Sequence, residues 1–479
     1  MALFRDASVA SIHPPGLALS RLASPIATFI VLSLIFGISS LVINPPLRGP
    51  DEAAHFLRIL AISNGDIAPS VSDAEGRKGT FIPAGLHDDF EFFESARYKL
   101  GTPGFSYVNI FNEFRRRRGS AETDTRPPVF VVYQGSEAYS PAPYLPYFVA
   151  VAVGRGLGLD FLGLFYLMRI AGLVTFTAAV AYAISIVPHL RWPFALIAML
   201  PSALYGRTVL SADGAALSLT LIAMALFLRS ACNLRERGLW ERACFMSLCG
   251  LAKPPQLAFL VLEFMSRPLR DLPRRARAIA LVVLPPLILS ALWVAATGMD
   301  AGTWRAMKVP DPPSEMFDPR HKLGLLLADP LHFVALVSAS LGRLDELWRE
   351  LIGVLGWLDT RLRDWIYPVL AGFLVASLFG SLPLPRATRY RIAAASMLTV
   401  VGYVVAVYLI FYLAWTPANA LSIDGVQGRY FVIVLAPIAS AIAAAVNWDP
   451  GETSTAVIAT GGAVLSGAAT VEALLRTNW

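Results

Sequence analysis

The chain has 479 residues, of which 56% are hydrophobic and only 15% are charged, and its formal net charge is +6. Soluble domains carry about 25% charged residues, so this composition excludes a soluble globular protein. The positive charge lies in short loops rather than on a soluble basic surface, which argues against nucleic acid as a partner. We therefore expect an all-α polytopic integral membrane protein whose partner is the lipid bilayer.

Apolar runs of membrane-spanning length recur from residue 25 to residue 474, and they predict about eleven transmembrane helices. The expected spans lie near residues 25–43, 162–187, 193–210, 213–229, 243–252, 254–265, 278–297, 365–382, 392–414, 430–446 and 455–474. Arginines gather in the short loops on one side of these spans, and the positive-inside rule places those loops in the cytoplasm. The N-terminal segment, residues 1–24, is expected on the same side.

The expected spans divide the chain into successive parts. The first transmembrane helix, 25–43, is followed by an extracytoplasmic loop over 44–161 that contains juxtamembrane helices. Transmembrane helices 2 to 7 follow over 162–297, then an extracytoplasmic amphipathic segment over 298–364, and transmembrane helices 8 to 11 within 365–479. We expect the large first loop to carry the working site, because the cytoplasmic face has only short loops.

Two short apolar stretches meet at Lys253. Each of them, 243–252 and 254–265, is too short to cross about 30 Å of hydrocarbon at about 1.5 Å per residue. Pro254 and Pro255 break the helix between them. Broken helices within a membrane are tolerated only where they face protein or a wet cavity, so we expect Lys253 at a tip sunk within the membrane.

Ionisable residues are expected together at the outer ends of the spans. Asp51, His55 and Arg58 follow the first span at positions i, i+4 and i+7 of a helix expected over 50–64, so they share one face. A carboxylate there can act as a general base, and nearby Arg or Lys side chains can hold a phosphate. The same spacing is also typical of an acid that complements the helix dipole and of solvated neighbours. Further charged residues expected at this level are Arg169, Arg207, Asp213, Lys253 and Arg429.

Short motifs follow one another in a recognisable order. They are Pro50-Asp51-Glu52 with His55-Phe56, then the segments 139–146, 210–214, 251–255, 353–359 and 425–431. In this order they resemble an uncharacterised bacterial family of multi-pass membrane proteins. That family in turn resembles the GT-C glycosyltransferases, which use polyprenyl-phosphate-linked sugars. The resemblance runs from about residue 25 to residue 446.

The resemblance implies a GT-C-like fold and a glycosyltransferase in the bacterial inner (plasma) membrane, with its active site on the periplasmic side. The enzyme would move a hexosyl or pentosyl group, with inversion, from a polyprenyl-phosphate-linked donor to a glycan or glycolipid acceptor of the cell envelope. Asp51 would be the general base. The implied catalytic residues are Asp51, Glu52 and His55. The implied substrate-binding residues are Arg58, Arg169, Arg207, Lys253, Gln427, Arg429 and Tyr430.

A divalent cation and two other functions remain open at this point. Asp51 and Asp213 are the residues that would bind Mg²⁺ or Mn²⁺ if the reaction requires a metal. The same cationic residues would suit a transporter or flippase that binds the headgroup of a lipid-linked sugar without catalysis. A structural or assembly subunit would need none of them.

Overall fold

The computed structural model describes residues 24–102, 105–118, 126–133, 135–232, 239–265, 269–297 and 316–479. The expected cytoplasmic segment 1–24, apart from Ser24, lies outside the described residues, as does the first part, 298–315, of the expected amphipathic segment. The described chain is mainly helical. Its sheet structure consists of two short antiparallel pairs.

Within the described residues, seven helices are long and apolar enough to cross a membrane. They are α2 (Pro25–Ile43), α7 (Phe161–Ile186), α10 (Asp213–Ala231), α13 (Leu272–Thr297), α19 (Arg386–Ala414), the continuous pair η5 (Gly428–Val434) and α20 (Leu435–Val446), and α21 (Glu452–Asn478). The segment Pro319–Gly353 would add an eighth span if it is one helix broken by a 106° bend. These helices confirm an all-α polytopic membrane protein.

Four of the eleven expected spans take the form of short or broken helices. They are α8 (Arg191–Met199) with α9 (Pro201–Thr208), α11 (Leu239–Ala252), η2 (Pro254–Leu260) with α12 (Val261–Met265), and α18 (Ile366–Leu378). Proline has no amide hydrogen and a fixed φ, so it ends a helix that hydropathy alone would continue. Pro201 and Pro254 lie at two of these breaks. Because α8 and α9 are almost completely buried, their apolar composition reflects contact with protein rather than with lipid.

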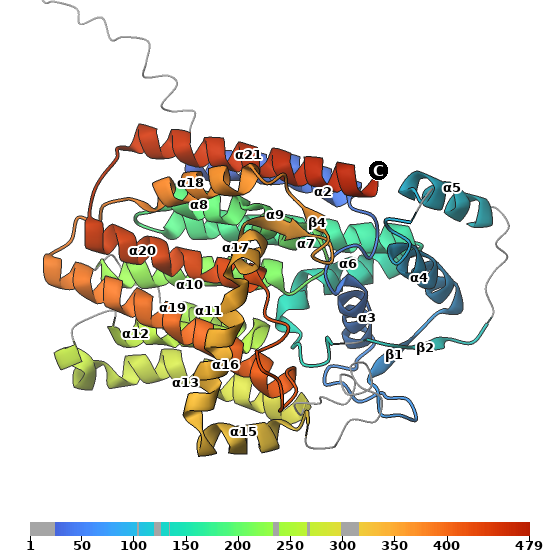
Figure 1. Cartoon of the computed structure of the whole chain (residues 1–479), viewed down its shortest axis with the longest axis horizontal. Coiled ribbons are helices and arrows are strands. Elements are labelled where there is room, and N and C mark those ends of the chain that lie inside the picture. Colours follow the sequence, from blue (N-terminus) through green and yellow to red (C-terminus); the bar gives the residue numbers. More distant parts are fainter. Residues whose placement is uncertain are drawn as a thin grey trace, which may run out of the picture.

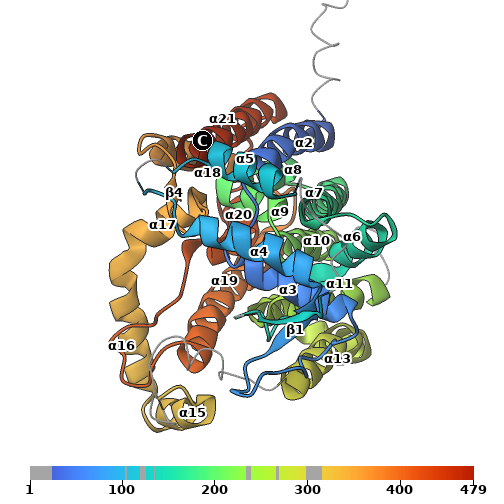
Figure 2. The same cartoon turned by 90° about the vertical axis from the view of Figure 1, so that its right-hand side faces the viewer.

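The long helices run side by side, and elements of the first loop gather at one end of the bundle (Figure 1). At the right of this view lie α3 (Glu52–Ser63), α4 (Ala84–Arg97) and α5 (Tyr107–Arg118), together with the strand pair β1 (Gly79–Ile82) and β2 (Val129–Val132). Figure 2 looks onto this end. The pairing of Gly79 with Val132 and of Ile82 with Val129 sets the register of the strands. All of these elements come from the expected loop 44–161.

The same loop closes with η1 (Ala142–Tyr144) and α6 (Leu145–Gly156), which covers the apolar stretch expected near the outer interface. A buried apolar cluster joins α3 to α6 and to the start of α7, with Phe56 and Phe165 at its centre. This packing fixes α3, and hence the residue that precedes it, against a membrane-spanning helix.

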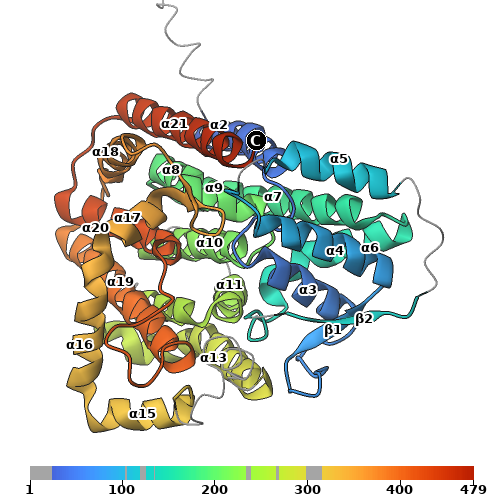
Figure 3. The same ribbon diagram turned by 45° about the vertical axis from the view of Figure 1, so that its right-hand side comes forward.

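The expected amphipathic helices form α15 (Pro319–Ala328), α16 (Pro330–Ser340) and α17 (Leu344–Gly353), linked by η4 (Leu341–Arg343). Of these, α16 and α17 cross the direction of the long helices along one side of the bundle (Figure 3). In α17, Leu347 and Ile352 are buried whereas Asp345 and Glu346 are exposed. The remaining short elements are η3 (Leu269–Asp271) and the strand pair β3 (Val354–Leu355) and β4 (Thr360–Arg361).

Candidate functional site

Four charged side chains from four separate elements converge at one place, and we refer to them as the charge cluster. Asp51 directly precedes α3, Asp213 opens α10, Lys253 links α11 to η2, and Arg429 lies in η5. The Arg429 guanidinium lies 3.5 Å from the Asp51 carboxylate and 3.4 Å from the Asp213 carboxylate. The Lys253 ammonium donates to Asp213. These four residues of the predicted site are therefore brought together.

The charge cluster is graded in exposure. The side chains of Lys253 and Arg429 are each 11% exposed, whereas that of Asp51 is 50% exposed. Asp213 lies between these extremes. Buried charges interact more strongly than solvated ones because water screens them less. The arrangement thus presents one accessible carboxylate next to two largely buried cations.

Aromatic and imidazole groups surround the charge cluster. The Lys253 Nζ lies 4.7 Å from the centre of the Tyr430 ring, and the Arg429 guanidinium lies 5.3 Å from it. The His55 Nδ1 lies 2.6 Å from the Tyr144 hydroxyl, and the Tyr139 ring is 5.2 Å from the imidazole. Burial lowers the pKa of His55 to about 4, against the opposing effect of the nearby carboxylates. His55 is therefore neutral at physiological pH.

Tyr139 and Tyr144 were not among the predicted site residues. Both belong to the motif 139–146, so the signal was present in the sequence without a reason to assign it to the site. Ser140 ties this segment to the bundle, because its hydroxyl donates to the Leu251 carbonyl oxygen over 2.7 Å. Leu251 lies two residues before Lys253, so the bond also holds the tyrosines beside the charge cluster.

Asp51 has a left-handed backbone conformation, with φ of 53° and ψ of 18°. The helix expected from residue 50 begins instead at Glu52, and the Asp51 side chain does not cap it. A non-glycine residue with positive φ is uncommon, and such residues cluster at functional sites. The His55 amide still donates to the Asp51 carbonyl oxygen over 3.0 Å, so Asp51 and His55 remain one helical turn apart.

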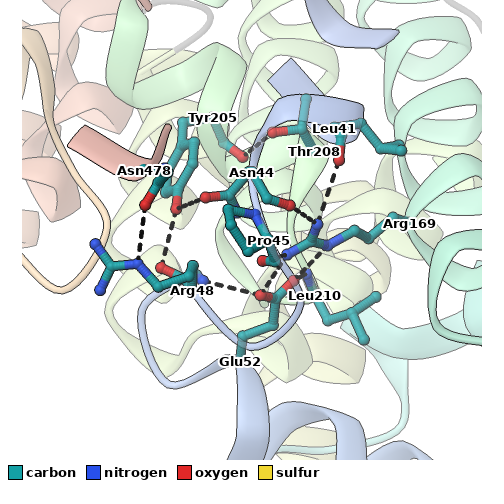
Figure 4. A network of polar contacts seen from close by, with 11 residues as sticks. Leu41, Asn44, Pro45, Arg48, Glu52, Arg169, Tyr205, Thr208, Leu210 and Asn478 are labelled. Atoms are coloured by element: carbon teal, nitrogen blue, oxygen red, sulfur yellow. Dashed lines mark hydrogen bonds and ion pairs between the residues drawn. The ribbon is translucent and has the colours of Figure 1, made fainter. Parts of the chain in front are cut away.

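The family resemblance implied a catalytic role for Glu52, but in the structure its carboxylate makes structural contacts (Figure 4). Its carboxylate is fully buried and accepts two bonds from Arg169, of 2.8 and 2.7 Å. It also accepts the Gly49 amide over 2.8 Å and the Leu210 amide over 2.9 Å. The carboxylate is therefore enclosed, and every bond it makes in this structure holds backbone or Arg169.

Arg169 completes this contact, and we call the Glu52–Arg169 pair the buried clamp. Besides Glu52, its guanidinium donates to the carbonyl oxygens of Leu41, Asn44 and Pro45 at 3.3, 2.6 and 3.0 Å (Figure 4). The buried clamp therefore joins the end of α2, the start of α3 and the loop that leads into α10. These are the segments that carry Asp51 and Asp213, so Arg169 holds together two segments that bear site residues.

Two other predicted substrate-binding arginines lie outside the charge cluster. Arg58 donates to the carbonyl oxygens of Asp66 and Ile67 at 3.0 and 2.5 Å, and so caps the loop after α3. Arg207 is fully buried and donates to the Ala198 carbonyl oxygen over 2.6 Å. Helical spacing placed Arg58 on the same face as Asp51, but a long side chain reaches the nearest free carbonyl groups instead.

Gln427 and Arg429 retain free hydrogen-bonding atoms beside the charge cluster. Within the described residues, Gln427 Oε1 and Arg429 Nε are buried and have no hydrogen-bond partner. Unpaired buried polar atoms are costly in a folded protein. A ligand that donates to Gln427 Oε1 and accepts from Arg429 Nε would satisfy both atoms.

The turn that carries Arg429 is held by α17, a contact that the sequence did not predict. The Gly428 amide donates to Glu350 over 2.6 Å. A Cβ atom at Gly428 would lie only 1.7 Å from the Leu347 carbonyl oxygen, so this position requires glycine. On the other side, the Tyr403 hydroxyl donates to the Tyr430 carbonyl oxygen over 3.0 Å.

The described residues do not fit a divalent cation between Asp51 and Asp213. The Arg429 guanidinium already lies between the two carboxylates and contacts both. No group of three or more His, Cys, Asp or Glu side chains in the described ranges is arranged to bind a metal ion.

Comparison with known proteins gives a family for this chain. A search of curated proteins and a search of solved structures found no match. A family model described as "Predicted membrane protein (DUF2142)" matches residues 34–439, which is most of the chain and includes all four residues of the charge cluster. The chain therefore belongs to the DUF2142 family of predicted membrane proteins.

Proposed function

We propose that this protein is an integral-membrane glycosyltransferase that moves a sugar from a polyprenyl-phosphate-linked donor to an acceptor outside the cytoplasm. The observation that carries the proposal is one accessible carboxylate, Asp51, beside two largely buried cations, Lys253 and Arg429. The acceptor would be a glycan or glycolipid of the cell envelope. The bacterial inner membrane and the periplasmic side follow from the resemblance and from the loop charges.

The chemistry needs a base and a place for the leaving phosphate. The acceptor hydroxyl oxygen attacks the anomeric carbon of the sugar while Asp51 takes the hydroxyl proton. The bond between the anomeric carbon and the phosphate oxygen breaks, and the polyprenyl phosphate leaves with that electron pair. Arg429 and Lys253 stabilise the charge that develops on the phosphate. Attack opposite to the leaving phosphate inverts the configuration of the sugar.

Asp213 supports these roles without contacting the reacting atoms. Its carboxylate forms ion pairs with both Lys253 and Arg429, so it orients the two cations. Tyr430 supplies a ring face to the same two cations. His55 is neutral and next to the Tyr144 hydroxyl, which suits hydrogen bonding to an acceptor sugar.

The direct test is the substitution Asp51→Asn. The purified protein is reconstituted into vesicles that contain polyprenyl-phosphate-linked sugars, and transfer or hydrolysis of the sugar is followed. Loss of a general base is expected to lower the rate by about 10²- to 10⁴-fold. The matched control is Asp345→Asn, an exposed acid of α17 with a side chain that is 75% exposed, and it should keep the wild-type rate.

Three outcomes distinguish a glycosyltransferase from a flippase and from a structural subunit. A folded Asp51→Asn variant that transfers sugar at the wild-type rate contradicts the assignment of the base. Movement of the lipid-linked sugar across the bilayer without any transfer would favour a flippase that uses the same cations. A phenotype that survives simultaneous replacement of Asp51, Lys253 and Arg429 would favour a structural subunit.

A further inference from the structure

A groove of about 550 Å³ lies between α2 and α21, away from the charge cluster. Its walls include Ile35 and Phe36 of α2 and Ala468 and Leu475 of α21. Phe36 packs directly onto α21, since a Cβ atom at Gly467 would lie 2.2 Å from its ring. The small Ala468 side chain next to it leaves the hollow unfilled. Both helices are long and apolar enough to cross a membrane, so the groove faces lipid.

One end of the groove carries two arginines that share a single acid. The guanidinium groups of Arg363 and Arg476 contact the same oxygen of Glu472, Oε1, at 2.9 and 3.4 Å. The Arg363 and Arg476 side chains are 58% and 47% exposed. These three side chains together carry a net charge of +1, which matches one phosphodiester.

Tryptophans place this end of the groove at the boundary between lipid and water. Trp365, two residues after Arg363, is 56% exposed, and Trp479 is exposed immediately after α21. Trp side chains are enriched at that boundary because one edge of the ring is apolar and the other donates a hydrogen bond. Lipid phosphates lie at the same depth. Arg363 and Arg476 are therefore at the right level to meet one.

We propose that this groove is a binding site for an anionic glycerophospholipid. One acyl chain lies against Phe36, Ala468 and Leu475, and the phosphodiester is bound by Arg363 and Arg476. The occupant is anionic rather than zwitterionic, because the site already has a net charge of +1. The choline group of a zwitterionic lipid would add another positive charge there. The site is independent of the glycosyl-transfer proposal, since it shares no residue with the charge cluster.

The test uses the full chain purified in a neutral detergent. Binding of phosphatidylglycerol and of phosphatidylcholine is measured by native mass spectrometry and by the rise in melting temperature. Each arginine near a membrane surface contributes about fivefold to binding of an anionic lipid. Arg363→Gln with Arg476→Gln is therefore expected to weaken binding of phosphatidylglycerol by about thirtyfold. The charge-matched control is Arg116→Gln with Arg117→Gln, on the exposed face of α5, which should leave binding unchanged.

A second variant keeps the test decisive if loss of the arginines disturbs folding around Glu472. Ala468→Phe fills the groove from its lipid-facing side and leaves both arginines in place. It should reduce retained phosphatidylglycerol in the same assay. Equal binding of phosphatidylglycerol and phosphatidylcholine by the wild type, or unchanged binding in both the double variant and Ala468→Phe, would overturn the proposal.

Discussion

A carboxylate enclosed in a membrane protein needs a hydrogen-bond donor at each oxygen, because no water can replace a missing partner. Glu52 meets this condition with two bonds from Arg169 and two from backbone amides. Its neighbour Asp51 is in a different environment: its side chain is 50% exposed, and its carboxylate lies 3.5 Å from the Arg429 guanidinium. Adjacent acids therefore have opposite roles, one structural and one available for chemistry.

The substitution Glu52→Gln tests the buried clamp. The NH₂ group that replaces one carboxylate oxygen is a donor, so it would face another donor, either the Arg169 guanidinium or a backbone amide. The substitution also leaves the positive charge of Arg169 without a counter-charge. Removing one partner of a buried ion pair costs about 3–5 kcal/mol, and we expect the free energy of unfolding to fall by that amount. Chemical denaturation of the protein in detergent measures this change. Glu75→Gln, at an exposed loop position, should cost less than about 0.5 kcal/mol. A Glu52→Gln variant as stable as the wild type would contradict the clamp.

At the scale of elements, the charge cluster depends on short pieces of backbone that approach each other closely. η5 reaches the cluster only because Gly428 lies against α17, where the Gly428 amide donates to Glu350. The break between α11 and η2 releases Lys253 from a helix, so its side chain turns toward Asp213. Broken helices of this kind are where polar backbone and charged side chains can meet within a bundle.

The substitution Gly428→Ala tests the contact between η5 and α17. The added methyl group would meet the Leu347 carbonyl oxygen at 1.7 Å, so one of the two elements must shift. Overpacking of this kind costs about 1–3 kcal/mol, and the displaced Arg429 should also weaken binding of polyprenyl phosphate, measured by titration. Gly372→Ala is the control, because a Cβ atom there has no neighbour within 4 Å. Unchanged stability and binding in Gly428→Ala would show that η5 does not depend on this contact.

At the scale of the whole molecule, the long helices separate two chemically different ends. The elements of the first loop, α3 to α6 with β1 and β2, lie at one end (Figure 1). At the other end lie the starts of α19 and α21 and the end of α10. Basic residues such as Arg229 and Arg386 belong to that second end. The positive-inside rule then predicts that the second end faces the cytoplasm.

Labelling of introduced cysteines tests this orientation. Ala74→Cys lies in the first loop, and Asp449→Cys lies in the turn between α20 and α21; both positions are exposed. In a background with the exposed Cys244 replaced by serine, a membrane-impermeant maleimide applied outside the inner membrane should label the cysteine at position 74. The cysteine at position 449 should react only after the membrane is permeabilised. The reverse pattern would invert the topology and place the charge cluster toward the cytoplasm.

The sequence was sufficient to predict the helical membrane class, and it placed the four residues of the charge cluster within a larger set of candidates. Apolar runs of spanning length leave few alternatives to transmembrane helices, and ionisable residues at membrane depth are rare enough to be informative. Its prediction of eleven spans was less accurate, because hydropathy cannot separate a buried helix such as α8 from a lipid-facing one. The break at Pro201 also divides a segment that was expected as one span, whereas the break at Pro254 was predicted from the sequence.

Only the tertiary structure decided which charged residues meet. Arg429 and Asp51 are far apart in the chain, and their contact depends on how α3, α10 and η5 pack together. From the sequence alone, the residues of the charge cluster could not be distinguished from four other candidates, Glu52, Arg58, Arg169 and Arg207. Their different roles follow from burial and from the particular carbonyl and amide groups within reach, and these are properties of the packed bundle rather than of residue type or spacing.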